Sequence, residues 1–208
     1  MYRAICTVIC LVVGTLSMNW SPSQESPDTP DIHKLFVRLN EPSTTNQAVH
    51  EIIEATTRNA SARQYIVQRL PDMINKQEPD SDVWRNGVHL AGHLKASETI
   101  PSLIKALSLG PAGGPMQTTF GTQMRLENDI VAKALAEIGD PAVTAVGNLL
   151  TSENKNTRRR AVLILRNMNS TSARKVLREH LPHETDEVTR ELIETGLRES
   201  LVESAPKS

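Results

Sequence analysis

Two histidines at helical spacing are the first candidates for chemistry in this chain. His89 and His93 lie four residues apart, so both imidazoles could reach one metal ion if the segment is helical. Alignment of the internal repeats described below places them opposite Lys133 and Glu137, which are outward positions. Two histidines alone make an incomplete metal site. We therefore expect a solvated helix face, with His89 and His93 as weak metal candidates.

Motifs for other kinds of catalysis are absent from the sequence. It contains no GxSxG, HExxH, P-loop or GxGxxG pattern. Gly110, Gly113 and Gly114 do not follow a predicted strand, which argues against a phosphate-binding loop. We accordingly expect no catalytic residues, no cofactor and no enzyme activity.

A basic stretch toward the C-terminal end has two interpretations. It comprises Arg158, Arg159, Arg160, Arg166, Arg174, Lys175 and Arg178, and an acidic segment, residues 184–203, follows it. The stretch could bind an anion or an acidic partner, or it could be a solvated face with salt bridges to the next repeat. The chain has 23 Lys and Arg against 24 Asp and Glu, a formal net charge of -1. This balance favours the solvated face, and it argues against nucleic-acid binding, as does the lack of aromatic residues among the arginines.

The first residues predict export. Residues 1–3 supply a positive start, and residues 4–16 form an apolar run. Thr15 and Ser17 are small residues in the positions required for cleavage after Ser17. We interpret residues 1–17 as a signal peptide of a secreted or periplasmic protein.

The alternative for this segment is an uncleaved membrane anchor with Trp20 at the interface. The only two cysteines, Cys6 and Cys10, lie inside the apolar run, so the exported chain would have no disulfide and no thiolate. Residues 18–30 are rich in Ser and Pro and are expected to be a disordered linker.

Three later segments repeat a pattern of helix, tight turn and helix. They are RNGVHLAGHLKASETIPSLIKAL (85–107), IVAKALAEIGDPAVTAVGNLL (130–150) and RAVLILRNMNSTSARKVLREHL (160–181). Leu94, Ile138 and Met168 align just before the turn, and the last two are separated by about one 30-residue repeat period. Only 3% of residues are aromatic, so the core must consist of Leu, Ile, Val and Ala, which suits packed helices. The sequence therefore predicts an all-α fold.

The turns between paired helices have recognisable chemistry. Gly139 is expected to take the left-handed conformation that ends a helix, with Asp140 capping the next helix and Pro141 in its first position. In the following repeat, Asn169 replaces the glycine, and Ser170 or Thr171 can cap. Each hairpin must bury its apolar sides against its neighbours, which explains the repetition.

Two flanking helices are also predicted. One contains Tyr65, Leu70 and Ile74 and should bend at Pro71. A terminal helix is expected over about residues 185–202, with a buried face of Val188, Leu192, Ile193, Leu197 and Leu201. Residues 204–208 are expected to be frayed.

Residues 134–150, ALAEIGDPAVTAVGNLL, resemble the HEAT-like repeat of the phycobilisome-lyase type. The resemblance covers residues 83–203 well and 43–75 weakly. It implies an armadillo-like α-solenoid over residues 31–203, a right-handed stack of about four to five hairpins. Lyase activity is not implied, because the repeat is a packing motif shared by many binding proteins.

A Gly/Pro-rich insertion, residues 108–127, interrupts the repeats. It is longer than most loops of compact domains, and long ordered loops on rigid scaffolds often carry function. Met116 and Phe120 are its apolar residues that could meet a partner, and a disordered spacer is the alternative.

The architecture predicts a scaffold that binds a protein partner through the second helices of its hairpins. The expected contacts are Lys105, Asn148, Arg174 and Arg178. One alternative is an enzyme, either lyase-like or metal-dependent, because His50–Glu51 and His183–Glu184 loosely resemble the pairs that hold two irons in HEAT-like hydroxylases. One pair is expected in mid-helix and the other in a turn, which argues against it. The other alternative is a structural envelope protein anchored at its N-terminus.

Overall fold

The computed structural model describes residues 31–39, 41, 45–108 and 126–203 of the 208-residue chain. These residues form helices and the turns between them, and none of them lies in a strand. The all-α class expected from the sequence is confirmed. The signal peptide, the linker and the frayed end predicted for residues 1–17, 18–30 and 204–208 lie outside the described residues.

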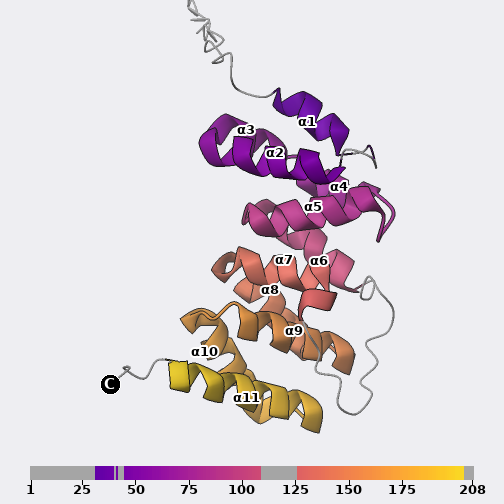
Figure 1. Cartoon of the computed structure of the whole chain (residues 1–208). Coiled ribbons are helices and arrows are strands. Elements are labelled where there is room, and N and C mark those ends of the chain that lie inside the picture. The colour runs from indigo at the N-terminus through magenta and orange to yellow at the C-terminus, as the bar shows by residue number, and fades with distance from the viewer. Residues whose placement is uncertain (1–30, 40, 42–44, 109–125, 204–208) are drawn as a thin grey trace, which may run out of the picture.

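The helices form successive hairpins that stack along one axis, as Figure 1 shows from α1 at one end to α11 at the other. The first helices of the hairpins are α2 (Thr45–Arg58), α5 (Asp82–His93), α7 (Ile130–Ile138) and α9 (Lys155–Asn167), and α11 (Glu187–Glu203) extends this layer. The second helices are α4 (Leu70–Lys76), α6 (Ile100–Ser108), α8 (Val143–Gly147) with η4 (Asn148–Thr151), and α10 (Thr171–His180).

The remaining short elements complete the stack. They are α1 (Ile32–Arg38), α3 (Ala60–Val67), η1 (Ser97–Thr99), η2 (Leu126–Asn128), η3 (Asp140–Ala142) and η5 (Leu181–His183). Of the predicted loop 108–127, Ser108 is the last residue of α6 and residues 126–127 belong to η2, so the insertion between helices is shorter than expected.

One continuous core runs between the layers and is made almost entirely of aliphatic side chains. Leu90 of α5, Leu135 of α7 and Ile164 of α9 are fully buried and belong to the first layer, while Leu103 and Leu150 close the core from the second. Trp84 is the one tryptophan of this core among the described residues. Burial of these side chains is the main stabilising contribution, because no hairpin could cover its own apolar sides alone.

The hairpin turns confirm the predicted alignment of the repeats. Lys95, Gly139 and Asn169 hold equivalent positions in the turn after the first helix of each hairpin, and their φ angles are positive, at 49°, 79° and 45°. Ser170 caps α10 by accepting a hydrogen bond from the backbone N–H of Ala173, as expected. The repeat register read from the sequence is therefore correct at the level of the backbone.

The central turn differs from the prediction in detail. Gly139 has ψ of -140°, which is not the left-handed helical conformation but a region that only glycine enters readily. Asp140 is the first residue of η3 instead of its cap, and neither η3 nor α8 begins with a side-chain capping hydrogen bond. The turn therefore depends on the backbone conformation of the glycine and not on capping by the Asp140 carboxylate.

Two other predictions need correction. The helix through Tyr65 does not bend at Pro71; it ends at Val67, and Pro71 lies in the first turn of the separate helix α4. Val188 of α11 is 44% exposed instead of buried. Thr189 is buried in its place, because its backbone N–H and hydroxyl both donate to Asp186 at the start of the helix.

Candidate functional site

The histidine pair of α5 lies on the surface, as the alignment predicted. His89 and His93 are exposed, with ring centroids 6.2 Å apart. Partial burial lowers the pKa of His89, which the carboxylate of Glu137 opposes by favouring the charged form. No group of three or more His, Cys, Asp and Glu in the described residues has the geometry to hold a metal ion.

The two His-Glu dipeptides do not converge. His50 and Glu51 lie in α2, where His50 faces Glu54 and Glu51 binds Arg38 at 2.9 Å. His183 ends η5 at the other end of the stack, and Glu184 follows it. The separation of these pairs matches the expectation and gives no shared ligand cage.

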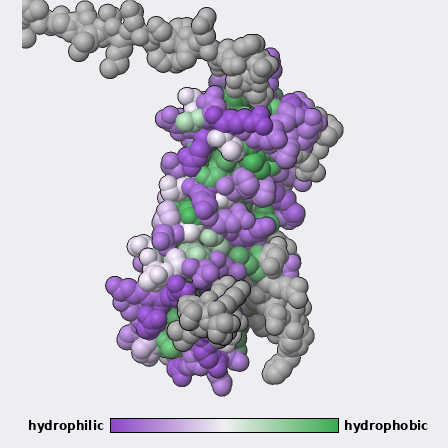
Figure 2. Space-filling model, turned by 60° about the vertical axis from the view of Figure 1, so that its left-hand side comes forward, coloured by the Kyte–Doolittle hydropathy of each residue, from purple (hydrophilic) through white to green (hydrophobic). Residues whose placement is uncertain are grey.

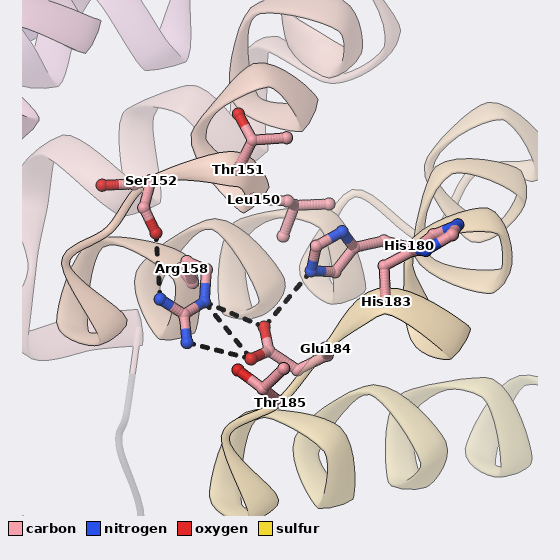
Figure 3. A pocket seen from close by; sticks show the side chains of 8 residues that line it. All are labelled: Leu150, Thr151, Ser152, Arg158, His180, His183, Glu184 and Thr185. Atoms are coloured by element: carbon pink, nitrogen blue, oxygen red, sulfur yellow. Dashed lines mark hydrogen bonds and ion pairs between the residues drawn. The ribbon is translucent and has the colours of Figure 1, made fainter.

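Glu184 instead forms the centre of a buried polar cluster beside a pocket of about 340 Å³. Its carboxylate accepts hydrogen bonds from Nε and Nη2 of Arg158, at 3.0 and 2.9 Å, and lies 3.2 Å from Nε2 of His180. The backbone N–H of Asp186 donates to it as well, at 2.8 Å. Figure 3 shows Arg158 and His180 pointing to the carboxylate from two sides.

The cluster holds Glu184 in its ionised form. Burial alone would raise the pKa of this carboxyl, but the hydrogen bonds from Arg158, Asp186 and His180 outweigh burial and lower the pKa to about 2. The same carboxylate raises the pKa of Arg158. A permanently ionised carboxylate whose oxygens are all engaged is a poor general base at neutral pH.

Two of the hydroxyls that line the pocket form hydrogen bonds. Thr151 donates to the carbonyl of Asn148, and Ser152 accepts the backbone N–H of Asn154. The carbonyl of Ser152 accepts from Nη1 of Arg158, which fastens η4 to the start of α9. The pocket therefore has the character of a structural joint between the last hairpins.

Arg159 and Arg160 correct the expectation of a solvated basic face. Both side chains are buried. Arg159 forms a two-pronged contact with Asp186, which is itself at the start of α11, at 2.8–3.1 Å. The predicted salt bridges to the next repeat are present, but they lie inside the stack and not on its surface, so these arginines are unavailable to an external anion.

Arg160 of α9 contacts the end of α6 and the residue before α7, on the two sides of the insertion. Its Nε donates to Asp129 at 2.7 Å, and its Nη1 donates to the carbonyl of Leu107. Its Nη2 lies 2.7 Å from the same carboxylate as an ion-pair contact without hydrogen-bond alignment. Asp129 also caps α7 through the backbone N–H of Ala132. One guanidinium thus holds the chain on both sides of the insertion.

Three of the predicted partner contacts are exposed residues of second helices. Lys105 and Asn148 occupy equivalent, exposed positions of α6 and η4, and Arg178 is exposed on α10. Arg174 is half-buried, and its guanidinium donates to the side chain of Asn169 at 3.3 Å in an exposed hydrogen bond. Lys175 is the exposed cation of α10 that sequence reasoning missed as a contact; the i, i+3 spacing to Arg178 is the signal that could have found it.

We call this surface the second-helix face and define it by the exposed residues of α6, α8–η4 and α10 that follow: Lys105, Thr144, Asn148, Thr151, Lys175, Arg178 and Glu179. Met116 and Phe120, the contacts predicted in the insertion, lie outside the described residues. Within the described residues, no helix has the length and apolar character needed to cross a membrane.

Residues 128–198 match the HEAT repeats family. The matched segment runs from the start of α7 into α11, so it contains the hairpins joined by Arg159, Arg160 and Glu184. No curated protein matches the chain. A crystal structure of an engineered protein aligns over 83% of this chain and 97% of that chain, at 21% identity and with a TM-score of 0.31. The helical hairpins of residues 128–198 are thus similar to HEAT repeats.

Proposed function

We propose that this HEAT repeat scaffold is a non-catalytic binding protein that receives a protein partner on its second-helix face. The single observation that carries the proposal is the contrast between the two sets of polar residues. Arg158, Arg159 and Arg160 are turned inward and paired with carboxylates, whereas Lys105, Lys175 and Arg178 are turned outward.

The division between buried and exposed cations has a physical consequence. Buried, paired charges hold neighbouring repeats in register and cannot be released without large cost. Exposed side chains on a rigid framework can meet a partner without reorganising the fold, which lowers the cost of association. The N-terminal apolar run of residues 4–16 supports a location outside the cytoplasm for this scaffold.

Site-specific photocrosslinking tests the proposed face. A photoreactive phenylalanine analogue would replace Asn148 on the second-helix face in one variant of the full chain and His93, exposed on α5, in a matched control. In extracts of the source cells, we expect a discrete adduct from position 148 and none of the same mass from position 93. Equal adducts from the two positions, or none from position 148, would refute the proposal.

A further inference from the structure

Cations outnumber carboxylates on the second-helix face. Lys105, Lys175 and Arg178 are exposed on it, and its single carboxylate, Glu179, lies 3.9 Å from Lys175. Helix α6, with the sequence IPSLIKALS, and the α8–η4 segment, VTAVGNLLT, contain no acidic residue. Within the described residues, no carboxylate forms an ion pair with Lys105 or Arg178. Lys105 and Arg178 thus leave the face with a net positive potential.

Apolar recognition is disfavoured on this face. The large hydrophobic side chains exposed in the described residues are Val37 of α1 and Val188 of α11, and neither belongs to a second helix. The side of the molecule drawn in Figure 2 is likewise hydrophilic over most of its area, with hydrophobic residues in small separate patches. Between the cations lie Thr144, Asn148 and Thr151, which can offer hydrogen bonds to a peptide backbone.

The distance between the cations determines how long a ligand must be to contact all of them. Helices α6, α8 and α10 are successive neighbours in the second layer. Packed helices lie about 8–10 Å apart, so Lys105 and the cations of α10 are separated by roughly 16–20 Å. An extended chain advances at most about 3.3–3.6 Å per residue, so it spans this distance in roughly five or six residues.

We infer that the partner presents an extended acidic segment, with carboxylates about five or six residues apart that bind Lys105 at one end and Lys175 and Arg178 at the other. This inference rests on the proposed function, and adds the chemical class and the spacing of what the face binds. Charge complementarity of this kind steers encounter and suppresses wrong partners.

Synthetic peptides test the inference directly. Three fluorescein-labelled Gly/Ser peptides would be titrated with the full chain, and anisotropy measured at low ionic strength, where screening is weak. The first carries two Asp-Glu pairs about five residues apart, the second has the same four carboxylates adjacent, and the third replaces them with lysines at the first spacing. We expect the first to bind several-fold more tightly than the second and the third not to bind.

A matched pair of variants locates the contact. Lys105→Glu, Lys175→Glu and Arg178→Glu together should weaken binding of the first peptide by about tenfold or more, because attraction is replaced by repulsion. The control reverses three exposed lysines elsewhere, Lys34, Lys133 and Lys155, with the same change in net charge. It should weaken binding by less than about threefold, the share due to long-range attraction alone. Circular dichroism and thermal unfolding confirm that both variants are folded.

The inference is overturned if the lysine peptide binds as well as the acidic one, if no acidic peptide binds, or if both triple variants lose affinity equally. These failures differ from failure of the proposed function. If the second-helix face still crosslinks a partner from Asn148 while the charge reversals leave that adduct unchanged, the partner uses this face without acidic recognition. If position 148 yields no adduct, the proposed function itself fails.

Discussion

At the scale of single residues, the most informative side chain is Glu184. It is fully buried, yet charged, because Arg158, His180 and the backbone of Asp186 provide hydrogen bonds to its oxygens. Asp186 is similar: burial opposes its ionisation, but hydrogen bonds from Thr189 and Arg159 lower its pKa to about 2. Both carboxylates fasten the last helix to the preceding hairpin.

Because the pKa values of these two carboxyl groups are lowered, the free energy of unfolding depends on pH. The folded state keeps Glu184 ionised down to about pH 2, whereas its ordinary pKa is 4.5. Because the folded pKa is below the unfolded one, the stabilisation is present in full above about pH 4.5 and is lost as pH falls toward 2. We expect the urea midpoint of unfolding to fall over this window.

The variant Glu184→Gln tests whether this carboxylate causes the loss of stability at low pH. The substitution should cost about 3 kcal/mol at neutral pH, because the charge of Arg158 loses its partner, and the decline toward pH 2 should become shallower. Glu187→Gln, at an exposed position of α11, should cost within about 0.5 kcal/mol and keep the slope of the wild type. Parallel pH profiles for wild type and Glu184→Gln would show that this carboxylate is not responsible.

At the scale of elements, the hairpin turn is the repeating unit that sequence reasoning captured best. Lys95, Gly139 and Asn169 share a positive φ, although their residue types differ. The shared position follows from the aligned apolar residues before each turn, which fix where each first helix must end. A left-handed backbone costs a residue with a side chain roughly 1–2 kcal/mol, so Lys95 carries strain that Gly139 avoids.

Reciprocal substitutions test this strain. Lys95→Gly should stabilise the protein by about 0.5–1 kcal/mol, the relief of strain exceeding the added freedom of the unfolded chain. Gly139→Ala should destabilise it by about 1–3 kcal/mol through backbone strain alone, since no atom lies within 4 Å of the added methyl group. Lys133→Gly, inside α7, is the control and should lose about 1 kcal/mol. Loss of stability in Lys95→Gly, measured by urea unfolding, would contradict the assigned turn geometry.

The packing between first helices gives a second test at this scale. Leu135 is fully buried in α7, between α5 and α9, so Leu135→Ala should cost about 2–5 kcal/mol. His93→Ala should change stability by within about 0.5 kcal/mol, because the imidazole is exposed on α5. Equilibrium urea unfolding of the two variants measures both values, and the reverse order would mean that the two layers have been wrongly assigned.

The buried arginines were beyond sequence reasoning for a physical reason. A run such as Arg158, Arg159 and Arg160 favours a solvated face when read alone, because burying a charge is costly unless it is paired. The partners are distant: Asp186 is 27 residues from Arg159, and Asp129 is 31 residues from Arg160. Both separations are close to one repeat period, which is the signal that could have predicted inter-repeat pairing. Arg158 and Glu184 are 26 residues apart and follow the same rule. The pocket beside them had no sequence signal, because η4, the start of α9 and the end of α10 line it together.

At the scale of the whole molecule, the second-helix face exists only because the stack of helices is open. Five first-layer helices follow one another as α2, α5, α7, α9 and α11, and each contacts the next. The second layer then presents α6, α8 and α10 side by side along the same axis. A closed bundle with the same helices would bury one of these layers and remove the second-helix face.

A distance across the stack tests this claim most directly. Spin labels would be attached to cysteines replacing Glu54 of α2 and Glu191 of α11, both exposed, in a Cys6→Ser and Cys10→Ser background, and measured by pulsed electron resonance. Four steps between packed helices at about 8–10 Å each predict a separation of roughly 32–40 Å. A distribution centred below about 20 Å, the width of two packed helices, would contradict the open solenoid and the binding face that depends on it.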